Sequence, residues 1–239
     1  MRLSRFFVDT PLSLGSHQLP EAQAHYLGRV LRMAVGEQIQ LFDGSGREFM
    51  ATLTEISKKM VVVEITNEDA GQPDSPLHIH LGQGLSRGER MDWAIQKATE
   101  LGVNEITPLF TERCEVRLND ERAEKRLAHW QQVAISACEQ CGRSSIPKIH
   151  PPQLLNDWLQ QTQADLKLIL HPVAEPLTSH NKPQRLAFVI GPEGGLTDNE
   201  IAQAQVNQFQ SARLGPRVLR TETAPVVAIT VAQQLWGDF

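Results

Sequence analysis

Two glycine-bearing turns carry the residues whose types and spacing suit the binding of a small molecule. The first turn, residues 191–195 (GPEGG), follows the apolar run 186–190 and precedes 196–200 (LTDNE), which is typical of the start of a capped helix. Glycines in such a turn let the backbone approach a ligand closely, and the N–H groups at a helix start are free to face it. Taken alone, this turn is more simply explained as an ordinary connection between a strand and a helix.

The second turn, residues 214–225 (LGPRVLRTETAP), leads into an apolar C-terminal stretch. It predicts another helix, with Thr221 or Thr223 as its N-cap. Arg220 and Glu222 would then stand at the mouth of the turn, beside a helix N-terminus. Long charged side chains at a turn are usually solvated, but this concentration of charge indicates a functional site.

Together the two turns resemble the C-terminal signature of the knotted SPOUT-class RNA methyltransferases, and specifically the family that methylates N3 of a uridine in small-subunit (16S) ribosomal RNA. Further segments are similar to the same family, in the expected order: 2–8 (RLSRFFV), 25–32 (HYLGRVLR), 42–46 (FDGSG), 96–103 (QKATELGV) and 139–143 (EQCGR). The resemblance covers nearly the whole chain. It implies an α/β fold with a C-terminal knotted SPOUT methyltransferase domain, S-adenosylmethionine as cofactor, and a small N-terminal PUA-like β-barrel that binds RNA.

The resemblance also implies which residues act on the cofactor and on the RNA. Both turns and one neighbouring strand end are expected to hold the cofactor, through Leu170, Ile190, Gly191, Glu193, Gly194, Gly195, Leu214, Gly215, Leu219, Thr223 and Ala224. The arginines expected to contact RNA are Arg2, Arg5, Arg29, Arg32, Arg87 and Arg113.

Catalysis requires the N3 proton of uridine to leave before the nitrogen can attack a methyl carbon. Arg220 or Arg143 could stabilise the resulting anion of the base. Glu222 could accept the proton, or it could orient Arg220. The sequence does not choose between these roles, so all three residues are expected to be catalytic.

The pattern along the chain predicts two domains. From 38 to 66, short strand-like runs separated by turn signals predict a small β-barrel or sandwich. A stretch rich in Pro, Gly, Asp and Ser at 70–76 is typical of a linker. The boundary is therefore expected to separate an RNA-binding domain, 1–72, from a methyltransferase domain, 73–239.

After the linker, strands alternate with helices, which predicts an open α/β sheet. Helices are expected at about 89–101 and 120–141, where apolar residues recur at helical spacing. The apolar runs 166–170 and 186–190 predict buried parallel strands.

Composition limits the partners that the chain can have. Of its 239 residues 41% are hydrophobic, yet no apolar run approaches the roughly 20 residues that cross a bilayer, so we expect no membrane partner and a cytoplasmic location. Three cysteines are typical of a reducing compartment. The net charge of −5 argues against nucleic-acid binding, but residues 1–36 carry four arginines against two acidic residues, a local charge of +2.

Motifs for other chemistries are set aside. The stretch 82–88 (GQGLSRG) lacks the spacing of a dinucleotide-binding loop. Cys138 and Cys141 form a C-x-x-C, but both fall on the apolar stripe of a predicted helix and only Cys114 remains as a further cysteine, which predicts packing. The eight histidines show no ligand spacing either, so no metal is expected.

Two rival functions remain open beside the methyltransferase. One is a non-catalytic RNA-binding ribosome-assembly factor with a vestigial cofactor pocket, which the intact charged residues of the second turn disfavour. The other is a nucleotide-binding α/β enzyme, which would lack the Lys-Ser/Thr pair of a P-loop. The resemblance further implies a homodimer that acts on small-subunit ribosomal RNA or the 30S subunit, with Val227, Val231 and Leu235 as one surface for pairing.

Overall fold

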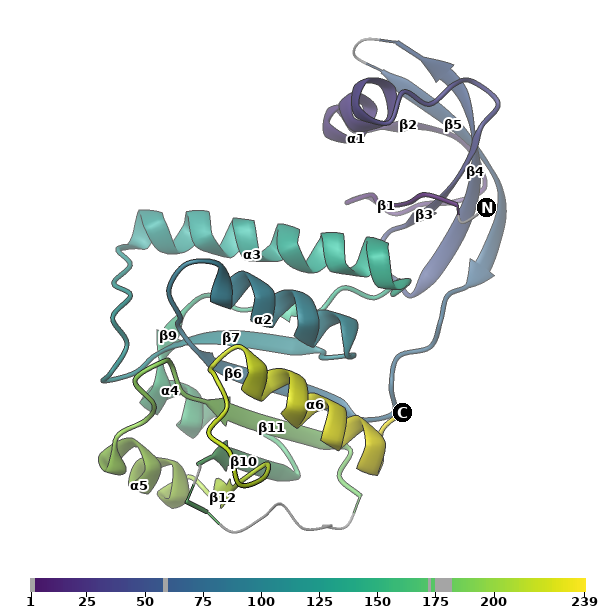
Figure 1. Ribbon diagram of the computed structural model, residues 1–239. Helices are drawn as coiled ribbons and strands as arrows, with labels where there is room; N and C mark the ends of the chain where they lie inside the picture. The colour runs from purple at the N-terminus through teal and green to yellow at the C-terminus, as the bar shows by residue number, and fades with distance from the viewer. Residues whose placement is uncertain (1–2, 58–59, 172, 175–181) are drawn as a thin grey trace. The chain divides into compact units, whose positions relative to one another are not determined.

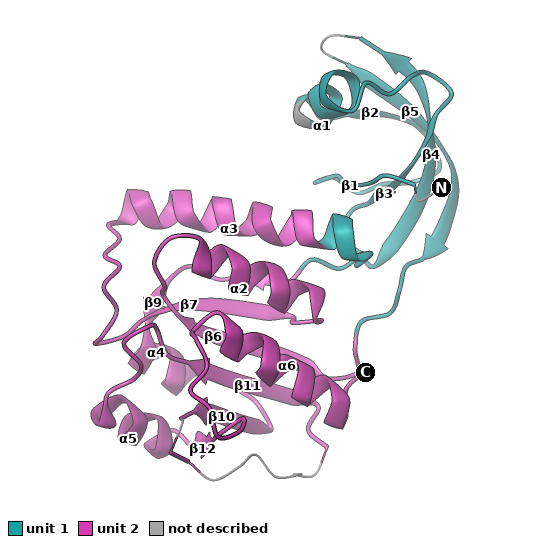
Figure 2. Ribbon diagram, in the orientation of Figure 1, with its two compact units in different colours: residues 1–74, 138–146 teal, residues 75–137, 147–239 magenta. Residues whose placement is uncertain are grey.

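The computed structural model describes residues 3–57, 60–171, 173–174 and 182–239. Arg2 lies outside the described residues. The chain divides into two compact units (Figure 2): unit 1 comprises Met1–Asp74 and Cys138–Ile146, and unit 2 comprises Ser75–Ala137 and Pro147–Phe239. The first cut falls two residues after the expected boundary. The sequence did not indicate that a later segment, 138–146, belongs to the first unit.

Unit 1 is built on a five-stranded sheet in the order β1-β3-β4-β5-β2 (Figure 1). β1 pairs with β3 in parallel, and the other pairs are antiparallel. Buried and partly buried positions alternate over residues 48–53 of β4, as the period of two requires. Two register shifts in the β4–β5 pair mark bulges, which increase local bending and twist. The elements are β1 (Arg5–Phe7), β2 (Gly15–Leu19), α1 (Glu21–His25), the π-helix η1 (Tyr26–Val30), β3 (Gln38–Phe42), β4 (Arg47–Ile56) and β5 (Val61–Ala70).

Arg5 ties the first strand of unit 1 to the segment 138–146. Its guanidinium donates to Glu48 Oε1 at 2.6 Å and to the backbone oxygen of Arg143 at 3.1 Å. The Arg5 side chain is only 7% exposed. The expectation that Arg5 contacts an RNA phosphate is therefore wrong, because its side chain is buried and both terminal nitrogens of its guanidinium are used within the unit.

Unit 2 contains a parallel sheet in the order β12-β10-β11-β6-β7-β8, with β9 also pairing with β7. The expected buried parallel strands are confirmed as β10 and β11. The strands are β6 (His78–Gly84), β7 (Glu105–Phe110), β8 (Lys148–Ile149), β9 (Gln153–Leu154), β10 (Leu166–Leu170), β11 (Arg185–Ile190) and β12 (Gln210–Ala212).

Helices cover both faces of this sheet, so its central strand β11 is buried on both sides (Figure 1). Phe188 packs into the core beneath α2, α3 and α6, whereas its neighbours Ala187 and Val189 pack into the core beneath α4 and α5. The helices are α2 (Glu89–Glu100), α3 (Asp120–Cys141), α4 (Leu155–Gln161), α5 (Asp198–Val206) and α6 (Thr223–Trp236). None of the helices in the described part of the chain is long and apolar enough to cross a membrane.

Candidate functional site

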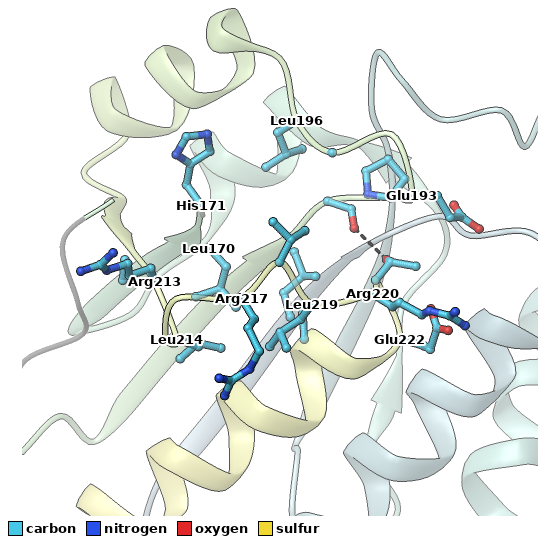
Figure 3. A pocket seen from close by; sticks show the side chains of 18 of the residues that line it. Leu170, His171, Glu193, Leu196, Arg213, Leu214, Arg217, Leu219, Arg220 and Glu222 are labelled. Carbon is cyan, nitrogen blue, oxygen red and sulfur yellow. Dashed lines mark hydrogen bonds between the residues drawn. The ribbon is translucent and has the colours of Figure 1, made fainter. Parts of the chain in front are cut away.

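The two glycine-bearing turns come together at the carboxyl ends of β10, β11 and β12, where they enclose a cavity of about 670 Å³ (Figure 3). Ligands of open α/β sheets bind at this end of the strands. Most of the residues expected to hold the cofactor line the cavity, namely Leu170, Ile190, Gly191, Glu193, Gly195, Leu214, Gly215, Leu219 and Ala224. Arg220, Glu222 and Arg113 line it as well.

Thr221 fastens the second turn to the first. Its hydroxyl donates to the backbone oxygen of Gly191 at 2.8 Å (Figure 3), and the amide of Gln83 donates to the same hydroxyl at 3.1 Å. The expectation that Thr221 or Thr223 caps α6 is therefore wrong, because the N-cap is Glu222, without a side-chain cap bond. The hydroxyl that could have capped the helix closes the cavity instead.

The first turn is held rigidly on both sides. On one side, a Cβ at Gly84, the last residue of β6, would lie 2.5 Å from the backbone nitrogen of Pro192, so only glycine fits there. On the other side, Thr197 and Glu200 form a capping box at the start of α5. The buried Glu200 carboxylate also accepts from the backbone N–H of Glu112 at 2.8 Å. The backbone of the turn is thus fixed before any ligand arrives.

Two carboxylates, Glu193 and Glu222, line the cavity beside five arginines, and Arg90 lies between the two carboxylates. Its guanidinium donates to Glu193 Oε1 at 2.8 Å, and its Nε lies 3.9 Å from Glu222 Oε2. Burial acts to raise the pKa of Glu193, but hydrogen bonds from its own backbone N–H, from that of Arg87 and from Arg90 outweigh it and lower the pKa below its usual value.

One carboxylate oxygen of Glu222 is ion-paired with Arg90 but accepts no hydrogen bond from any described residue. This oxygen, Oε2, is buried and has no hydrogen-bond partner among the residues that the structure describes. A buried carboxylate oxygen without a donor is costly unless a ligand satisfies it. This oxygen can therefore accept a proton or a hydrogen bond from whatever occupies the cavity.

Several expected site residues lie elsewhere. Gly194 and Thr223 belong to the two turns without lining the cavity. Arg143 belongs to unit 1, where its side chain is 12% exposed and lies 3.3 Å from Asp74. Arg29 and Arg32 are exposed in unit 1, so they stay available to RNA.

Arg87 and Arg113 sit at the edges of the first turn. Arg113 donates to the backbone oxygens of Gly194 and Leu196 at 3.1 and 3.3 Å. Arg87 lines a second, smaller cavity instead.

The sequence did not predict every residue that lines the first cavity. The residues outside the expected cofactor, catalytic and RNA sets are Arg90, His171, Pro192, Leu196, Ala212, Arg213, Arg217, Val218 and Thr221. Except for Arg90, they lie in or beside the two turns or at the ends of β10 and β12, so their position in sequence was the available signal.

The C-x-x-C motif packs within unit 1. Cys138 is fully buried, and burial raises the pKa of its thiol to about 12. A thiol with such a pKa stays protonated at neutral pH and is a poor metal ligand or nucleophile. All three cysteines are free in the structure.

Four histidine and glutamate side chains meet in unit 2, which sequence spacing did not indicate. Glu105 Oε2 lies 2.7 Å from His150 Nε2, and its other oxygen lies 3.3 Å from His78 Nε2. His80 Nε2 accepts from the indole of Trp158 at 3.3 Å, so it holds the neutral form. His80, Glu105 and His150 are close enough to share a metal ion, but each already has a protein partner.

The histidine cluster predicts acid-sensitive folding. Burial is the main cause that lowers the pKa of His80 from 6.5 to about 4, so the unfolded chain binds one more proton between these values. The free energy of unfolding should fall by about 3 kcal/mol as the pH drops from 6.5 to 4. Below this range the lowered pKa of Glu105 adds a further loss.

Urea unfolding at several pH values measures this dependence. His80→Gln should flatten the pH profile above pH 4, because glutamine does not titrate. Equal slopes for the wild type and His80→Gln would contradict the assignment.

Two protein families match different parts of the chain. The family model for the RNA methyltransferase domain matches residues 73–233, and that for the RNA methyltransferase PUA domain matches residues 19–66. Ribosomal RNA small subunit methyltransferase E of Buchnera aphidicola subsp. Acyrthosiphon pisum is 37% identical over 100% of this chain and 96% of its own length. The protein of the same name from Bacillus subtilis is 31% identical over 95% of each chain.

Solved structures agree over the full length. Ribosomal RNA small subunit methyltransferase E from Neisseria gonorrhoeae, bound to S-adenosyl methionine, is 42% identical, with a TM-score of 0.93 and 100% of both chains covered. A Legionella pneumophila protein in complex with the cofactor SAM is 41% identical, with a TM-score of 0.97 and the same coverage. The predicted SPOUT-class α/β fold with an N-terminal PUA-like domain is confirmed. With family models, relatives and structures in agreement over both parts of the sequence, this chain belongs to the RNA methyltransferase family that includes ribosomal RNA small subunit methyltransferase E.

Proposed function

We propose that this chain transfers the methyl group of S-adenosylmethionine to N3 of a uridine in small-subunit ribosomal RNA. The observation that carries the proposal is the cavity between the two turns, which combines a glycine-lined backbone, apolar walls and two carboxylates. The names of the relatives support the enzyme class and the RNA. Two solved relatives with the cofactor support its identity.

Apolar residues, glycines and two carboxylates of the cavity fit different parts of S-adenosylmethionine. Leu170, Ile190 and Leu214 offer apolar contacts to an adenosine ring. At Gly191 an added Cβ would lie 3.1 Å from the carbonyl carbon of Gly195, and Gly195 has φ +71°, so both positions favour glycine and keep the backbone close to the ligand. The carboxylates of Glu193 and Glu222 complement a sulfonium and an ammonium group.

The proposed mechanism assigns one role to Glu222 and one to Arg220, both in the second turn. When bound, S-adenosylmethionine supplies a methyl carbon whose bond to sulfur breaks, with the electron pair leaving on sulfur. Glu222 takes the N3 proton of uridine through Oε2, the oxygen that accepts no hydrogen bond from the described residues, which frees the nitrogen lone pair for attack. Arg220 stabilises the negative charge that develops on the base. Arg90 holds Glu222 and Glu193 on their side of the cavity.

The RNA contacts follow the two units. We assign RNA binding to the domain at 1–72, through Arg2, Arg29 and Arg32, and methyl transfer to the domain at 73–239, with Arg87 and Arg113 beside the cavity. Arg143 lies in unit 1 and is not among the cavity residues, so in this proposal it orders the segment 138–146 rather than touching the base. The target uridine must be unpaired or flipped, because N3 lies inside a base pair.

The remaining proposals concern assembly and surroundings. We propose a homodimer in the cytoplasm, with Leu235 of α6, 44% exposed, on the pairing surface beside the less exposed Val227 and Val231. We also expect no metal to take part in the reaction. The non-catalytic alternative is disfavoured, because Arg220 and Glu222 both line the cavity.

Two measurements test the proposed function. Calorimetric titration with S-adenosylmethionine should give a 1:1 binding isotherm per chain. Mass spectrometry of 16S ribosomal RNA from a deletion strain should show one 3-methyluridine lost, and complementation should restore it. A full complement of methylated uridine in the deletion strain, or the absence of binding heat beside a verified enzyme, would contradict the proposal.

A further inference from the structure

A second cavity of about 290 Å³ opens in unit 2 beside the start of α2. Its lining combines apolar side chains with two arginines and one glutamate. The lining residues are Leu85, Ser86, Arg87, Gly88, Met91, Glu115, Val116, Leu118, Arg126 and Trp130. We propose that this cavity binds one nucleotide of the RNA next to the methylated uridine, an inference that rests on the proposed function.

The charged residues of the second cavity and the start of α2 suit a phosphate group. Gly88 is the N-cap of α2, and no side chain caps this 12-residue helix, so its N-terminal N–H groups are open to an anion. Arg126 is exposed and makes no hydrogen bond or ion pair with any described residue. Arg87 pairs with Glu115 at 2.7 Å, but both side chains are 64% exposed. An ion pair so exposed is weak, and a phosphate can replace it.

The apolar residues of the second cavity and Trp130 suit a nucleobase. Leu85 and Met91 are buried beneath the cavity, and Val116 and Leu118 are partly buried beside it. Trp130 is 2% exposed, and its indole N–H has no hydrogen-bond partner within the described part of the chain. A buried donor left unpaired costs free energy, which a base carbonyl can recover. The volume is near the lower end of small-molecule sites, about 300 to 1,000 Å³, so it admits a single nucleotide.

Hydrogen bonds connect the second cavity to the first. The hydroxyl of Ser86, which lines the second cavity, lies 3.3 Å from the hydroxyl of Thr221, which lines the first. The backbone N–H of Arg87 donates to Glu193 Oε1 at 3.0 Å. Residues that line the two cavities are therefore in direct contact. A nucleotide bound in the second would therefore be a chain neighbour of a base presented to the first.

The indole N–H of Trp130 gives a direct readout of binding. In protein labelled with ¹⁵N-tryptophan and saturated with S-adenosylmethionine, the resonance of Trp130 is the one missing from Trp130→Phe. Titration with uridine 5′-monophosphate should shift it. Uridine without phosphate, and inorganic phosphate alone, should each shift it at concentrations at least about fivefold higher.

Arg126→Ala should weaken the binding of uridine 5′-monophosphate about five- to tenfold. The control is Lys125→Ala, which changes the adjacent exposed cation, paired with Glu121, and should leave the titration unchanged. In methyl transfer to small subunits lacking the modification, Arg126→Ala and Trp130→Phe should raise the KM for RNA severalfold, with the Kd for S-adenosylmethionine unchanged.

These outcomes distinguish a failure of the nucleotide site from a failure of the proposed methyl transfer. A Trp130 shift that Arg126→Ala weakens supports the nucleotide site even if no methyl transfer is found. No shift up to about 10 mM nucleotide, or a shift of equal strength in Arg126→Ala and with inorganic phosphate, would overturn the site even in an active methyltransferase.

Discussion

Glu222→Gln is expected to slow methyl transfer by a factor on the order of 10² to 10⁴, the usual contribution of a positioned general base. Glutamine keeps the shape of the side chain but cannot take the N3 proton. The rate of the variant should rise with pH through the alkaline range, because hydroxide can then remove this proton. Single-turnover transfer of a tritiated methyl group to small subunits that lack the modification measures the effect. Glu121→Gln, on the exposed surface of α3, is the matched control and should react at the wild-type rate.

A double-mutant cycle with Arg220→Ala decides between the two roles of Glu222. If Glu222 only orients Arg220, the double variant should be no slower than Arg220→Ala alone. If Glu222 is the base and Arg220 stabilises the anion, the double variant should be slower than either single variant. Wild-type rates in both single variants, with folding intact, would remove the pair from the mechanism.

Gly84→Ala is expected to remove most of the affinity for S-adenosylmethionine. The added Cβ would meet the backbone of the first turn, at 2.5 Å from Pro192 N and 2.8 Å from the carbonyl carbon of Gly191. Backbone held by the Thr221 hydrogen bond and the α5 capping box cannot move aside without opening the cavity. The free energy of unfolding should fall by about 1 to 3 kcal/mol, as is typical of overpacking. Affinity should fall more than about tenfold, since every tenfold corresponds to 1.4 kcal/mol of lost binding.

Denaturant unfolding and calorimetric titration measure the two effects of Gly84→Ala. Gly28→Ala is the control, because its Cβ would meet only Ile56 Cγ2, at an ordinary 3.5 Å. The control should keep wild-type affinity for the cofactor. Unchanged affinity in Gly84→Ala would show that the first turn does not hold the cofactor in the way proposed.

The sequence was most informative where local chemistry decides local structure. The glycine turns, the apolar runs of β10 and β11, and the long helix α3 were all expected at or near their observed positions. These features follow from turn residues and from periodicity. The convergence of the two turns into one cavity could be expected only through the family resemblance, because periodicity does not report which strands become neighbours.

Contacts between distant residues explain the errors. Arg5 looked like a phosphate contact, but Glu48 and the segment 138–146 enclose it. The sequence favoured Thr221 as a helix cap, but its hydroxyl donates to the backbone oxygen of Gly191. Glu105 is 45 residues from its partner His150, so no local spacing pointed to their cluster. In each case the competing partner is set by tertiary structure.

The segment 138–146 has a consequence for how the protein is made. Unit 1 needs residues up to 74 and then this later segment, which supplies Glu139 Oε1 to the backbone N–H of Phe7 and the Ser144 hydroxyl to Glu48. The ribosome must add 72 further residues, 75 to 146, before the N-terminal unit can be completed. At about 5 to 20 residues per second this is a delay of roughly 4 to 14 s. During translation unit 1 therefore waits for the synthesis of residues 75–137 of unit 2, and no single cut in the chain yields both units whole.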